Sequence, residues 1–356
     1  MKRLSIKIMS KLTIISFLFI VLWMASAFAE DKTYNLSFTT IYMDKHPTVQ
    51  NAFFPWMKDV EKLSNGRIKM TYFNPNTLCP AQDNYDSTVN GVVDISGQYC
   101  GQNPGKFPLN EAMELPMIVP GSEAGSLLTW ALYNEFPDWQ NEYKDIKILW
   151  QWASATYQLH TKTKLVKKVE DLKGMKIIGW SPKLLDMLKA LGASPLQISP
   201  TDTYLALERG MADGVLCPLA PVRSYKISDA VKYHTIIDIN VGPFWAGINK
   251  QVWDELPADL QKIMVDTTGA KLARESGKSL DEGAMIDAQW MKSLGHTFYV
   301  VPEDEKVLWF SKLQNMHENW VIKMEEKGYK NARAILNEAV KLGKEYGKTT
   351  GRGFTE

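Results

Sequence analysis

The sequence predicts an α/β fold divided into two lobes. Short apolar runs that suit buried strands alternate along the chain with segments whose apolar residues recur at helical spacing, such as the run 175–178 followed by the helical pattern 184–191. Strands separated by helices need crossover connections, which give parallel sheets. The chain has 356 residues, more than one hydrophobic core usually supports, so we expect two lobes.

The expected elements of the first lobe begin at residue 34. The run 34–40 alternates apolar and polar residues like a strand, and a helical pattern opens at His46 and Pro47 and stops at Asn65 and Gly66. The remaining elements expected here are a strand at 68–73, a helix around 86–89, a strand-like run at 92–96, an aromatic-rich helix over 121–143 and a strand at 146–152.

The second lobe is expected to start after a crossing near Ala155. Its expected elements are a strand at 175–178, a helix at 184–191, a turn at 192–195, a helix at 203–209 and the start of a strand at 214–216. A strand at 243–249 then returns to the first lobe. A long helix capped at 254–258 runs to about 294, with Asp259 near its start suiting the helix dipole, and two further helices are expected at 302–327 and 332–346.

The N-terminal residues have the pattern of a secretory signal peptide. Four basic residues precede an uncharged run over 12–24, and the small residues 25–29 suggest cleavage after Ala29. The run is shorter than the roughly 20 residues of a membrane span, which argues against an uncleaved anchor and any stable membrane insertion. Of the 41 Lys and Arg residues, less these four, 37 remain against 40 Asp and Glu, so the charge gives no case for binding nucleic acid.

The three cysteines, Cys79, Cys100 and Cys217, allow one disulfide in an oxidising periplasm. We expect Cys79 to pair with Cys100, because each closes a strand-like run in the same predicted sheet, which leaves Cys217 free. Three reduced, packed thiols are the alternative, since bond geometry cannot be inferred from the sequence. No CxxC pair or Cys/His cluster predicts a metal site, and no cofactor is expected.

The motifs of an enzyme are missing from the sequence. It contains no GxSxG, HExxH, GxGxxG or Walker loop, and the glycines and serines of 121–126 open a helix, where they act as caps. His46 belongs to the first strand-to-helix loop. The other histidines, His160, His234, His296 and His317, are far apart in the sequence, and we expect them to be solvated or to make single hydrogen bonds.

One continuous stretch, 171–218, carries a resemblance to a known family. It contains DLKGMKII, LGASP, YLALERG and DGVLCP in that order, and the first half of the chain adds HPT, SNGRIKMTYF, GVVDI and ELPMI. This wording resembles the solute receptors of tripartite ATP-independent periplasmic (TRAP) transporters, the DctP-type family, over nearly all of the chain after the leader.

The resemblance implies the two-lobed periplasmic binding protein fold, type II-like, with a long helix bracing both lobes. We expect 30–155 and 244–283 in lobe I, 156–243 and 284–350 in lobe II, and a frayed tail at 351–356. In such a fold the ligand lies between the lobes at the carboxyl ends of the strands, and closure of one lobe on the other buries it.

Three substitutions replace residues that usually bind the ligand in this family. Ile178 stands where the family carries its carboxylate-binding Arg, Cys217 stands where it carries Asn, and Gln158 stands where relatives often carry a second Arg. A carboxylate buried unpaired beside Ile178 costs several kcal/mol, more than half of the roughly 8 kcal/mol of a micromolar affinity. Either the acid is held elsewhere or the ligand is not an acid.

The remaining candidates for ligand contact are mostly aromatic. Trp180 and Trp245 directly follow strand-like runs, at positions where the resemblance implies the cleft lining, and a flat ligand ring can stack on an indole there. Arg223 is the best surviving cation, although a solvated or lobe-bridging Arg is the commoner role. The full candidate set is Trp180, Trp245, Arg223, Tyr157, Gln158, Ile178, Cys217, His46 and Phe244. The pocket favours a ligand with an aromatic or branched apolar body over a small dicarboxylate or sugar acid.

The sequence therefore predicts a periplasmic receptor that captures a small organic ligand and delivers it to a TRAP-type membrane permease, without catalysis. Ligand contacts to both lobes would stabilise the closed state that the permease recognises. One alternative is a receptor on the same fold that reports to a signalling protein. The other is a periplasmic enzyme that uses carboxylates and tyrosine in the cleft.

Overall fold

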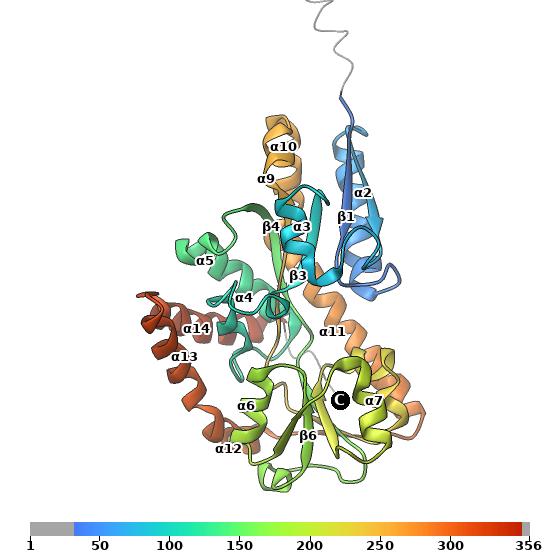
Figure 1. Ribbon diagram of the computed structural model, residues 1–356, viewed down its shortest axis with the longest axis vertical. Coiled ribbons are helices and arrows are strands. Elements are labelled where there is room, and N and C mark those ends of the chain that lie inside the picture. The colour runs from blue at the N-terminus through green and yellow to red at the C-terminus, as the bar shows by residue number, and fades with distance from the viewer. Residues whose placement is uncertain (1–31, 351–356) are drawn as a thin grey trace, which may run out of the picture.

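A computed structural model describes residues 32–350, so the expected signal peptide at 1–29 and the tail at 351–356 lie outside the described residues. Within these residues two sheets form two lobes, drawn one above the other in Figure 1. None of the helices over 32–350 combines the length and the apolar character needed to cross a membrane.

The first sheet has five strands in the order β2-β1-β3-β10-β4. Strands β1, β2 and β3 are parallel, and β10 runs antiparallel to both β3 and β4, so the carboxyl ends of the other four strands meet at one edge. The strands are β1 (Tyr34–Thr39), β2 (Ile68–Phe73), β3 (Ile95–Tyr99), β4 (Ile146–Ala153) and β10 (Pro243–Asn249).

The second sheet has six strands in the order β11-β9-β5-β8-β6-β7. Here β5 is the antiparallel strand, so the carboxyl ends of its neighbours again share an edge with the start of β5. The strands are β5 (Gln158–Thr161), β6 (Lys176–Gly179), β7 (Ser194–Gln197), β8 (Gly214–Cys217), β9 (Tyr233–Ile236) and β11 (Thr297–Val300).

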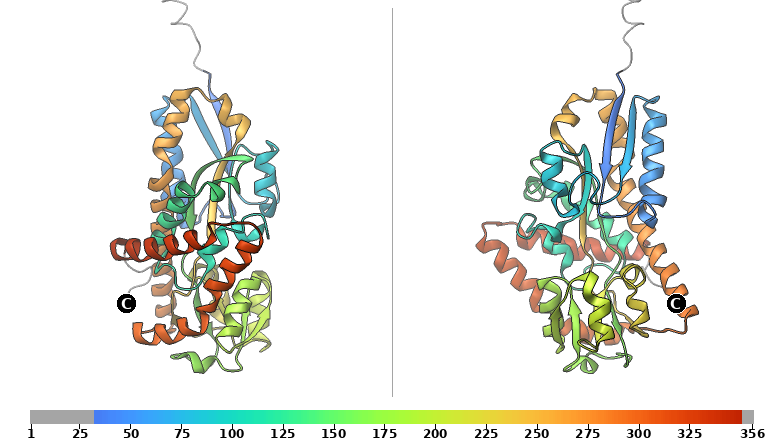
Figure 2. Two further views of the ribbon diagram at one scale, coloured as in Figure 1. Left: turned by 90° about the vertical axis from the view of Figure 1, so that its left-hand side faces the viewer. Right: turned by 45° about the vertical axis from the view of Figure 1, so that its right-hand side comes forward.

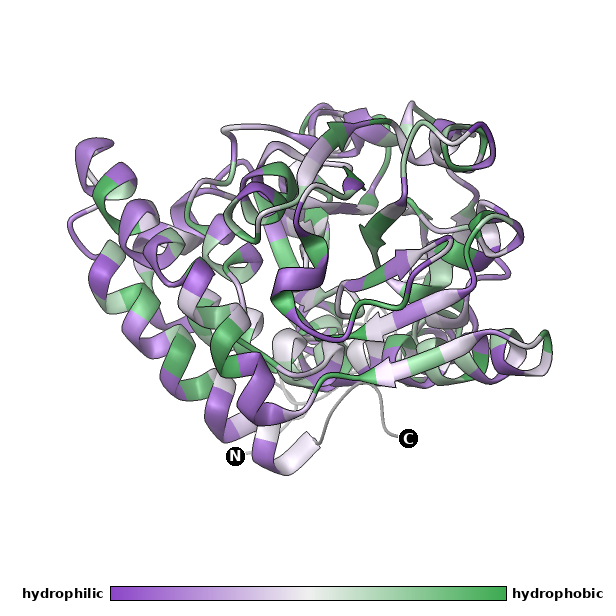
Figure 3. Cartoon of the chain, turned by 90° about the horizontal axis from the view of Figure 1, so that it is seen from below, coloured by the Kyte–Doolittle hydropathy of each residue, from purple (hydrophilic) through white to green (hydrophobic). Residues whose placement is uncertain are grey.

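Helices surround both sheets and alternate polar and apolar residues along their length (Figure 3), as amphipathic helices on a sheet do. The α-helices are α2 (Phe54–Leu63), α3 (Asn84–Val89), α4 (Ser122–Glu135), α5 (Pro137–Asn141), α6 (Pro182–Ala190), α7 (Pro200–Glu208), α8 (Leu219–Ser224), α9 (Lys250–Glu255), α10 (Ala258–Thr267), α11 (Gly269–Ser293), α12 (Glu303–Leu313), α13 (Asn315–Glu326) and α14 (Ala332–Thr350). The shorter turns are η1 (Val49–Phe53), η2 (Ala81–Asp83), η3 (Cys100–Gln102), η4 (Asn110–Glu114), η5 (Val169–Leu172) and η6 (Ile227–Asp229).

Three predicted helices are interrupted. Pro137 begins α5 and separates it from α4, because proline cannot continue the hydrogen bonding of the preceding helix. The long helix expected from 254 begins instead as α9 and α10 and breaks at Thr268, before Gly269 with its positive φ of 60°. The helix expected at 302–327 divides into α12 and α13 at Gln314, and nothing in the sequence there explains the break.

Some strands were missed or displaced. The segment expected as a turn at 192–195 leads directly into β7, and β3 starts where the run 92–96 was expected to end. No strand was predicted from the sequence at the positions of β5, β9 and β11. Each has only four residues, which is too short for an alternation of polar and apolar residues to stand out.

The chain passes between the lobes through β4 to β5, through β9 to β10, and along α11, which runs beside both lobes in Figure 2. Helix α14 packs on α4 of the first lobe, which differs from our placing of 284–350 in lobe II. The packing of α14 favours moving 332–350 to the first lobe, and the other lobe boundaries remain a prediction.

The expected disulfide is not formed. Cys79, Cys100 and Cys217 are all free thiols, as in the alternative of reduced, packed cysteines. Cys100 lies in the core, where its thiol contacts the Tyr143 hydroxyl at 3.3 Å, while the Cys79 thiol lies 3.4 Å from Asn84 Oδ1. The two thiols therefore have separate partners.

Candidate functional site

The carboxyl edges of the two sheets lie on either side of the crossing segments 154–157 and 237–242. The first edge carries Tyr99 at the end of β3 and Phe244 at the start of β10, and the second edge carries Gln158 at the start of β5 and Cys217 at the end of β8. Open α/β sheets bind their ligands at such edges. The cleft between these edges is therefore the candidate site.

An aromatic stack lies at the carboxyl edge of the first sheet. The His46 ring lies parallel to the Tyr42 ring, with centroids 3.9 Å apart, and Tyr42 stacks in turn on Phe244 at 5.8 Å. Phe244 also stacks on Trp152 at 5.1 Å and contacts Tyr99 at 5.4 Å. Burial lowers the pKa of His46 to about 4, so this histidine is neutral at pH 7. The rings of this stack are therefore uncharged at pH 7.

Trp245 lies on the other side of the same strand. Successive residues of a strand point to opposite faces, so Trp245 faces away from Phe244 and packs in the core against Tyr85, with centroids 5.4 Å apart, and against Phe107. The side chain is fully buried. This geometry places Trp245 in the core, whereas Phe244, another candidate, lies on the opposite face of the strand beside Tyr42 and Tyr99.

The second-lobe candidates are divided between core and edge. Ile178 and Cys217 are buried in the hydrophobic core, and burial raises the pKa of the Cys217 thiol. Trp180 is half-buried after β6, and its indole N–H donates to the Thr203 hydroxyl at 3.0 Å. Trp180 is thus held in one orientation at the edge of the second sheet.

Arg223 bonds within the second half of the molecule. Its guanidinium pairs with Asp287 of α11 at 3.0 Å and lies over the Trp290 ring, 4.6 Å from the centroid. The side chain is half-exposed. The sequence left a structural role for Arg223 open as the alternative to ligand binding. The contacts with Asp287 and Trp290 are of this structural kind.

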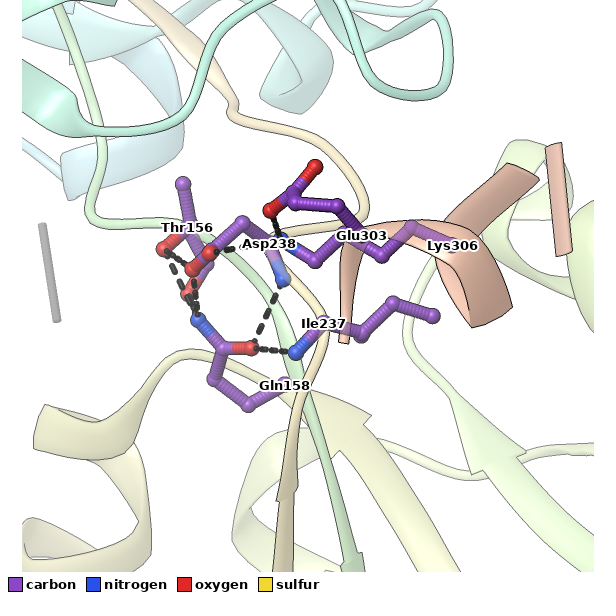
Figure 4. Close-up of polar contacts among 6 residues, drawn as sticks. All are labelled: Thr156, Gln158, Ile237, Asp238, Glu303 and Lys306. Atoms are coloured by element: carbon purple, nitrogen blue, oxygen red, sulfur yellow. Dashed lines mark hydrogen bonds and ion pairs between the residues drawn. The ribbon is translucent and has the colours of Figure 1, made fainter. Parts of the chain in front are cut away.

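Gln158 sits inside the hinge, as Figure 4 shows. Its amide oxygen accepts hydrogen bonds from the backbone N–H of Ile237 at 2.7 Å and of Asp238 at 2.9 Å, and its amide nitrogen donates to the Thr156 hydroxyl and to Asp238 Oδ1, each at 2.8 Å. An amide has two donors and two acceptor sites, so all are used. Gln158 ties one crossing segment to the other and has no polar capacity left for a ligand.

Asp238 is the centre of this hinge network. Its backbone has a positive φ of 54°, a conformation that few residues other than glycine adopt. Besides Gln158, its carboxylate accepts from the Thr156 hydroxyl at 2.9 Å and pairs with Lys306 of α12 at 3.2 Å. Both charged groups are largely buried, and Lys306 also pairs with Glu303 at 3.8 Å (Figure 4).

Tyr99 and Glu114 form a polar pair beside the aromatic stack that the sequence reasoning missed. The Tyr99 hydroxyl donates to Glu114 Oε1 at 2.5 Å. Burial raises the pKa of Glu114, and the positive charge of Lys183 and the bond from Tyr99 partly oppose this rise. Tyr157 lies near enough for Glu114 to raise the pKa of its hydroxyl, although burial is the main cause. The only signal in the sequence was an acid at the start of the apolar ELPMI stretch.

Three buried histidines are linked into a chain, contrary to the expectation of single or solvated histidines. His160 Nε2–H donates to the Cys217 carbonyl at 3.0 Å, so its neutral Nδ1 accepts from His234 Nδ1–H at 2.7 Å. His234 Nε2 accepts from His296 Nδ1–H at 2.9 Å, and His296 Nε2 accepts from the Lys232 ammonium at 3.2 Å. The carbonyl at one end and the ammonium at the other fix every tautomer.

Residues 32–350 contain no group of His, Cys, Asp and Glu side chains arranged to hold a metal ion. A cavity of about 480 Å³ lies beside the cleft, between η4, α6 and α13, and the aromatic stack does not line it. On its wall Lys183 of α6 pairs with Glu111 of η4 at 3.1 Å, a contact that joins the two lobes.

The molecule has two lobes, each built on one sheet, and the chain crosses between them twice through strands and once along helix α11. This arrangement is that of a two-lobed ligand receptor. The sequence profile described as "Bacterial extracellular solute-binding protein, family 7" (DctP) matches residues 38–324. The chain belongs to this family, and it is a ligand receptor of the TRAP transporter class, as its resemblance predicted. Receptors of this class bind small molecules and deliver them to permease subunits.

Solved structures and curated relatives agree with this assignment. A TRAP solute-binding protein from Rhodoferax ferrireducens T118, solved with copurified benzoate, has a TM-score of 0.80 and 29% identity and covers 90% of this chain and 100% of its own. A marine metagenome TRAP solute-binding protein specific for aromatic acid ligands was solved with 3-hydroxybenzoate. It has a TM-score of 0.78 and 25% identity, and the match covers 88% of this chain and 99% of the metagenome protein. The C4-dicarboxylate-binding periplasmic protein DctP of Rhodobacter capsulatus is 28% identical over 72% of this chain and 78% of its own.

Proposed function

We propose that this receptor binds an aromatic carboxylic acid in the interlobe cleft and delivers it to a TRAP-type permease, and that it catalyses nothing. The observation that carries the proposal is the stack of His46, Tyr42, Phe244 and Trp152 at the carboxyl edge of the first sheet. A planar ring gains stacking and burial energy on such a stack, and a small aliphatic dicarboxylate gains neither.

The polar groups of the cleft also support an aromatic ligand. The positions of the family's two arginines hold Ile178, which is buried in the core, and Gln158, which is saturated within the hinge. The ligand carboxylate would therefore be met by neutral donors and by backbone N–H groups rather than by an arginine clamp. The ligands named for the two solved neighbours, benzoate and 3-hydroxybenzoate, are of the proposed class.

Delivery to a permease requires a closed state that the ligand stabilises. The Lys183–Glu111 ion pair links the lobes across the cavity beside the cleft, and the hinge network of Gln158 and Asp238 holds the two crossing segments together. A periplasmic location, reached through the predicted signal peptide, fits a family whose members act outside the cytoplasm.

Calorimetric titration of the purified receptor with benzoate, succinate and glucuronate tests the ligand class. Benzoate should bind at micromolar or lower concentration and the other two should not. Mass spectrometry of compounds that copurify provides an independent readout, and recovery of a small aliphatic dicarboxylate would overturn the proposal. Recovery of the bound acid in unchanged form after long incubation is the expected result for a receptor, and its conversion would instead indicate an enzyme.

A further inference from the structure

We propose that Glu114 selects, among aromatic acids, those that carry a hydrogen-bond donor such as a ring hydroxyl. The inference rests on the proposed function, because it assumes that the ring lies against the aromatic stack. In this arrangement the ligand hydroxyl donates to the Glu114 carboxylate, which thereby determines specificity within the ligand class.

Glu114 is the last residue of η4 and is only 8% exposed. Carboxylates are rarely buried without partners, because a buried ionised group must replace its lost water with hydrogen bonds or a paired cation. Among the described residues, Tyr99 is the one side chain that donates a hydrogen bond to it, and this bond goes to Oε1. A carboxylate has about four acceptor sites, so Glu114 retains unused acceptor capacity.

The nearest cation does not supply what is missing. Lys183 lies close enough to influence Glu114, but its ammonium donates to Glu111, at 3.1 Å to Oε2 and 3.2 Å to the carbonyl oxygen. Lys323 approaches the same Glu111 carboxylate at 3.8 Å. Lys183 and Lys323 thus pair with Glu111, and the side chain that bonds Glu114 is the neutral hydroxyl of Tyr99.

The position of Glu114 is fixed through Tyr99. The Tyr99 ring lies against Gly101 and Gly242, where an added Cβ atom would come within 2.4 Å and 2.8 Å of ring atoms. On another side the ring contacts Phe244, with centroids 5.4 Å apart. The pair is therefore held next to the aromatic stack, where a substituent on a bound ring can reach it.

A fixed buried acceptor discriminates strongly between ligands. A ligand that lacks the hydroxyl covers Glu114 without bonding it, and sites built to bond a hydroxyl reject analogues without it. We expect at least one hydroxybenzoate isomer to bind about tenfold more tightly than benzoate.

The test compares benzoate with 2-, 3- and 4-hydroxybenzoate by calorimetry on the full receptor. Two variants, Glu114→Gln and Glu114→Leu, weaken or remove the acceptor, and Glu318→Gln is the matched control, because Glu318 is an exposed acid of α13 that pairs with Arg333 and takes no part in the cleft. The preference for the hydroxylated probe should shrink in Glu114→Gln, vanish in Glu114→Leu and persist in Glu318→Gln. Thermal melts verify that each variant is folded.

The outcomes separate the two proposals. If benzoate and all three isomers bind the wild-type receptor equally, or if the preference survives in Glu114→Leu, the role of Glu114 is overturned while an aromatic-acid receptor stands. If no probe binds a folded wild-type receptor, the proposed ligand class fails, and the inference that depends on it fails as well.

Discussion

Acid should destabilise this protein through the histidine chain, and replacing His160 should remove much of that effect. His160 and His234 are fully buried, and His296 nearly so. Burial lowers the pKa of all three, and the neighbouring histidines lower that of His234 further. Added protons would leave two donors facing each other inside the chain. The unfolded chain therefore binds more protons than the folded one, and stability must fall as the pH falls.

The size of the effect can be worked out from His160 alone. Its pKa is about 4 in the folded protein against an ordinary 6.5. A group with this depressed pKa contributes stability that is complete above pH 6.5 and is lost as the pH falls toward 4. Between pH 7 and pH 5 the loss from one such residue is about 2 kcal/mol. This is a large share of the 5–15 kcal/mol that is typical of a folded domain.

The assay is urea unfolding followed by tryptophan fluorescence at pH 7, 6 and 5, with the slope checked at each pH. His160→Gln keeps a donor for the Cys217 carbonyl and removes the titration at this position. It should lower stability at pH 7, since His234 loses its acceptor, and it should reduce the loss between pH 7 and pH 5 by about 2 kcal/mol.

His317→Gln is the matched control. His317 makes one hydrogen bond, to the backbone carbonyl of Pro116 at 2.9 Å, and is not part of the chain of three linked histidines. Its replacement should therefore leave most of the acid sensitivity in place. The reasoning is refuted if His160→Gln loses as much stability between pH 7 and pH 5 as the wild-type protein does.

Three further predictions concern the cleft and the hinge. Phe244→Ala should weaken the binding of benzoate by about 1 kcal/mol or more in calorimetry. Trp245→Ala should instead lower the free energy of unfolding in urea by about 3–5 kcal/mol, and the reverse pattern would show that Trp245 contacts the ligand. Gly242→Ala forces the Tyr99 ring to move, because its Cβ would lie 2.8 Å away, so the affinity for hydroxybenzoate should fall, and an unchanged affinity would contradict the close packing. Asp238→Asn removes the shorter of the two ion pairs of Lys306, at 3.2 Å, and leaves it the pair with Glu303 at 3.8 Å, so it should destabilise the protein by about 2 kcal/mol, and a loss below about 0.5 kcal/mol would show that the ion pair contributes little.

The sequence predicted most of the fold because its longer elements carry local signals. Strands β1, β2, β4 and β10 were located to within a residue at each end, and the LGASP stretch lay where α6 gives way to β7. The breaks in the long helices were missed, although two of them lie at residues that often end a helix. Pro137 begins α5, and α11 begins at Gly269, which has a positive φ.

The cleft was harder to predict, for reasons seen in β10. All seven of its residues are buried, so no alternation of polar and apolar residues distinguishes the face of Phe244 from that of Trp245. The histidine chain depends on the pairing of β5 with β9, which places His160 opposite His234. Partners so distant in sequence cannot be recognised before the strand order is known. Gln158 was located correctly on the edge, but its bonds to Asp238 also depend on this pairing.

Helix α11 has a mechanical consequence for lobe motion. Toward the first lobe, its Asp281 carboxylate accepts from the backbone N–H groups that start α4, each at 2.9 Å. Toward the second lobe, Asp287 holds Arg223 at 3.0 Å. Between them lies Gly283, beside Pro47, in a stretch of roughly 9 Å of helix. Any rotation of one lobe against the other must bend this stretch, and its stiffness limits how far the receptor can swing open.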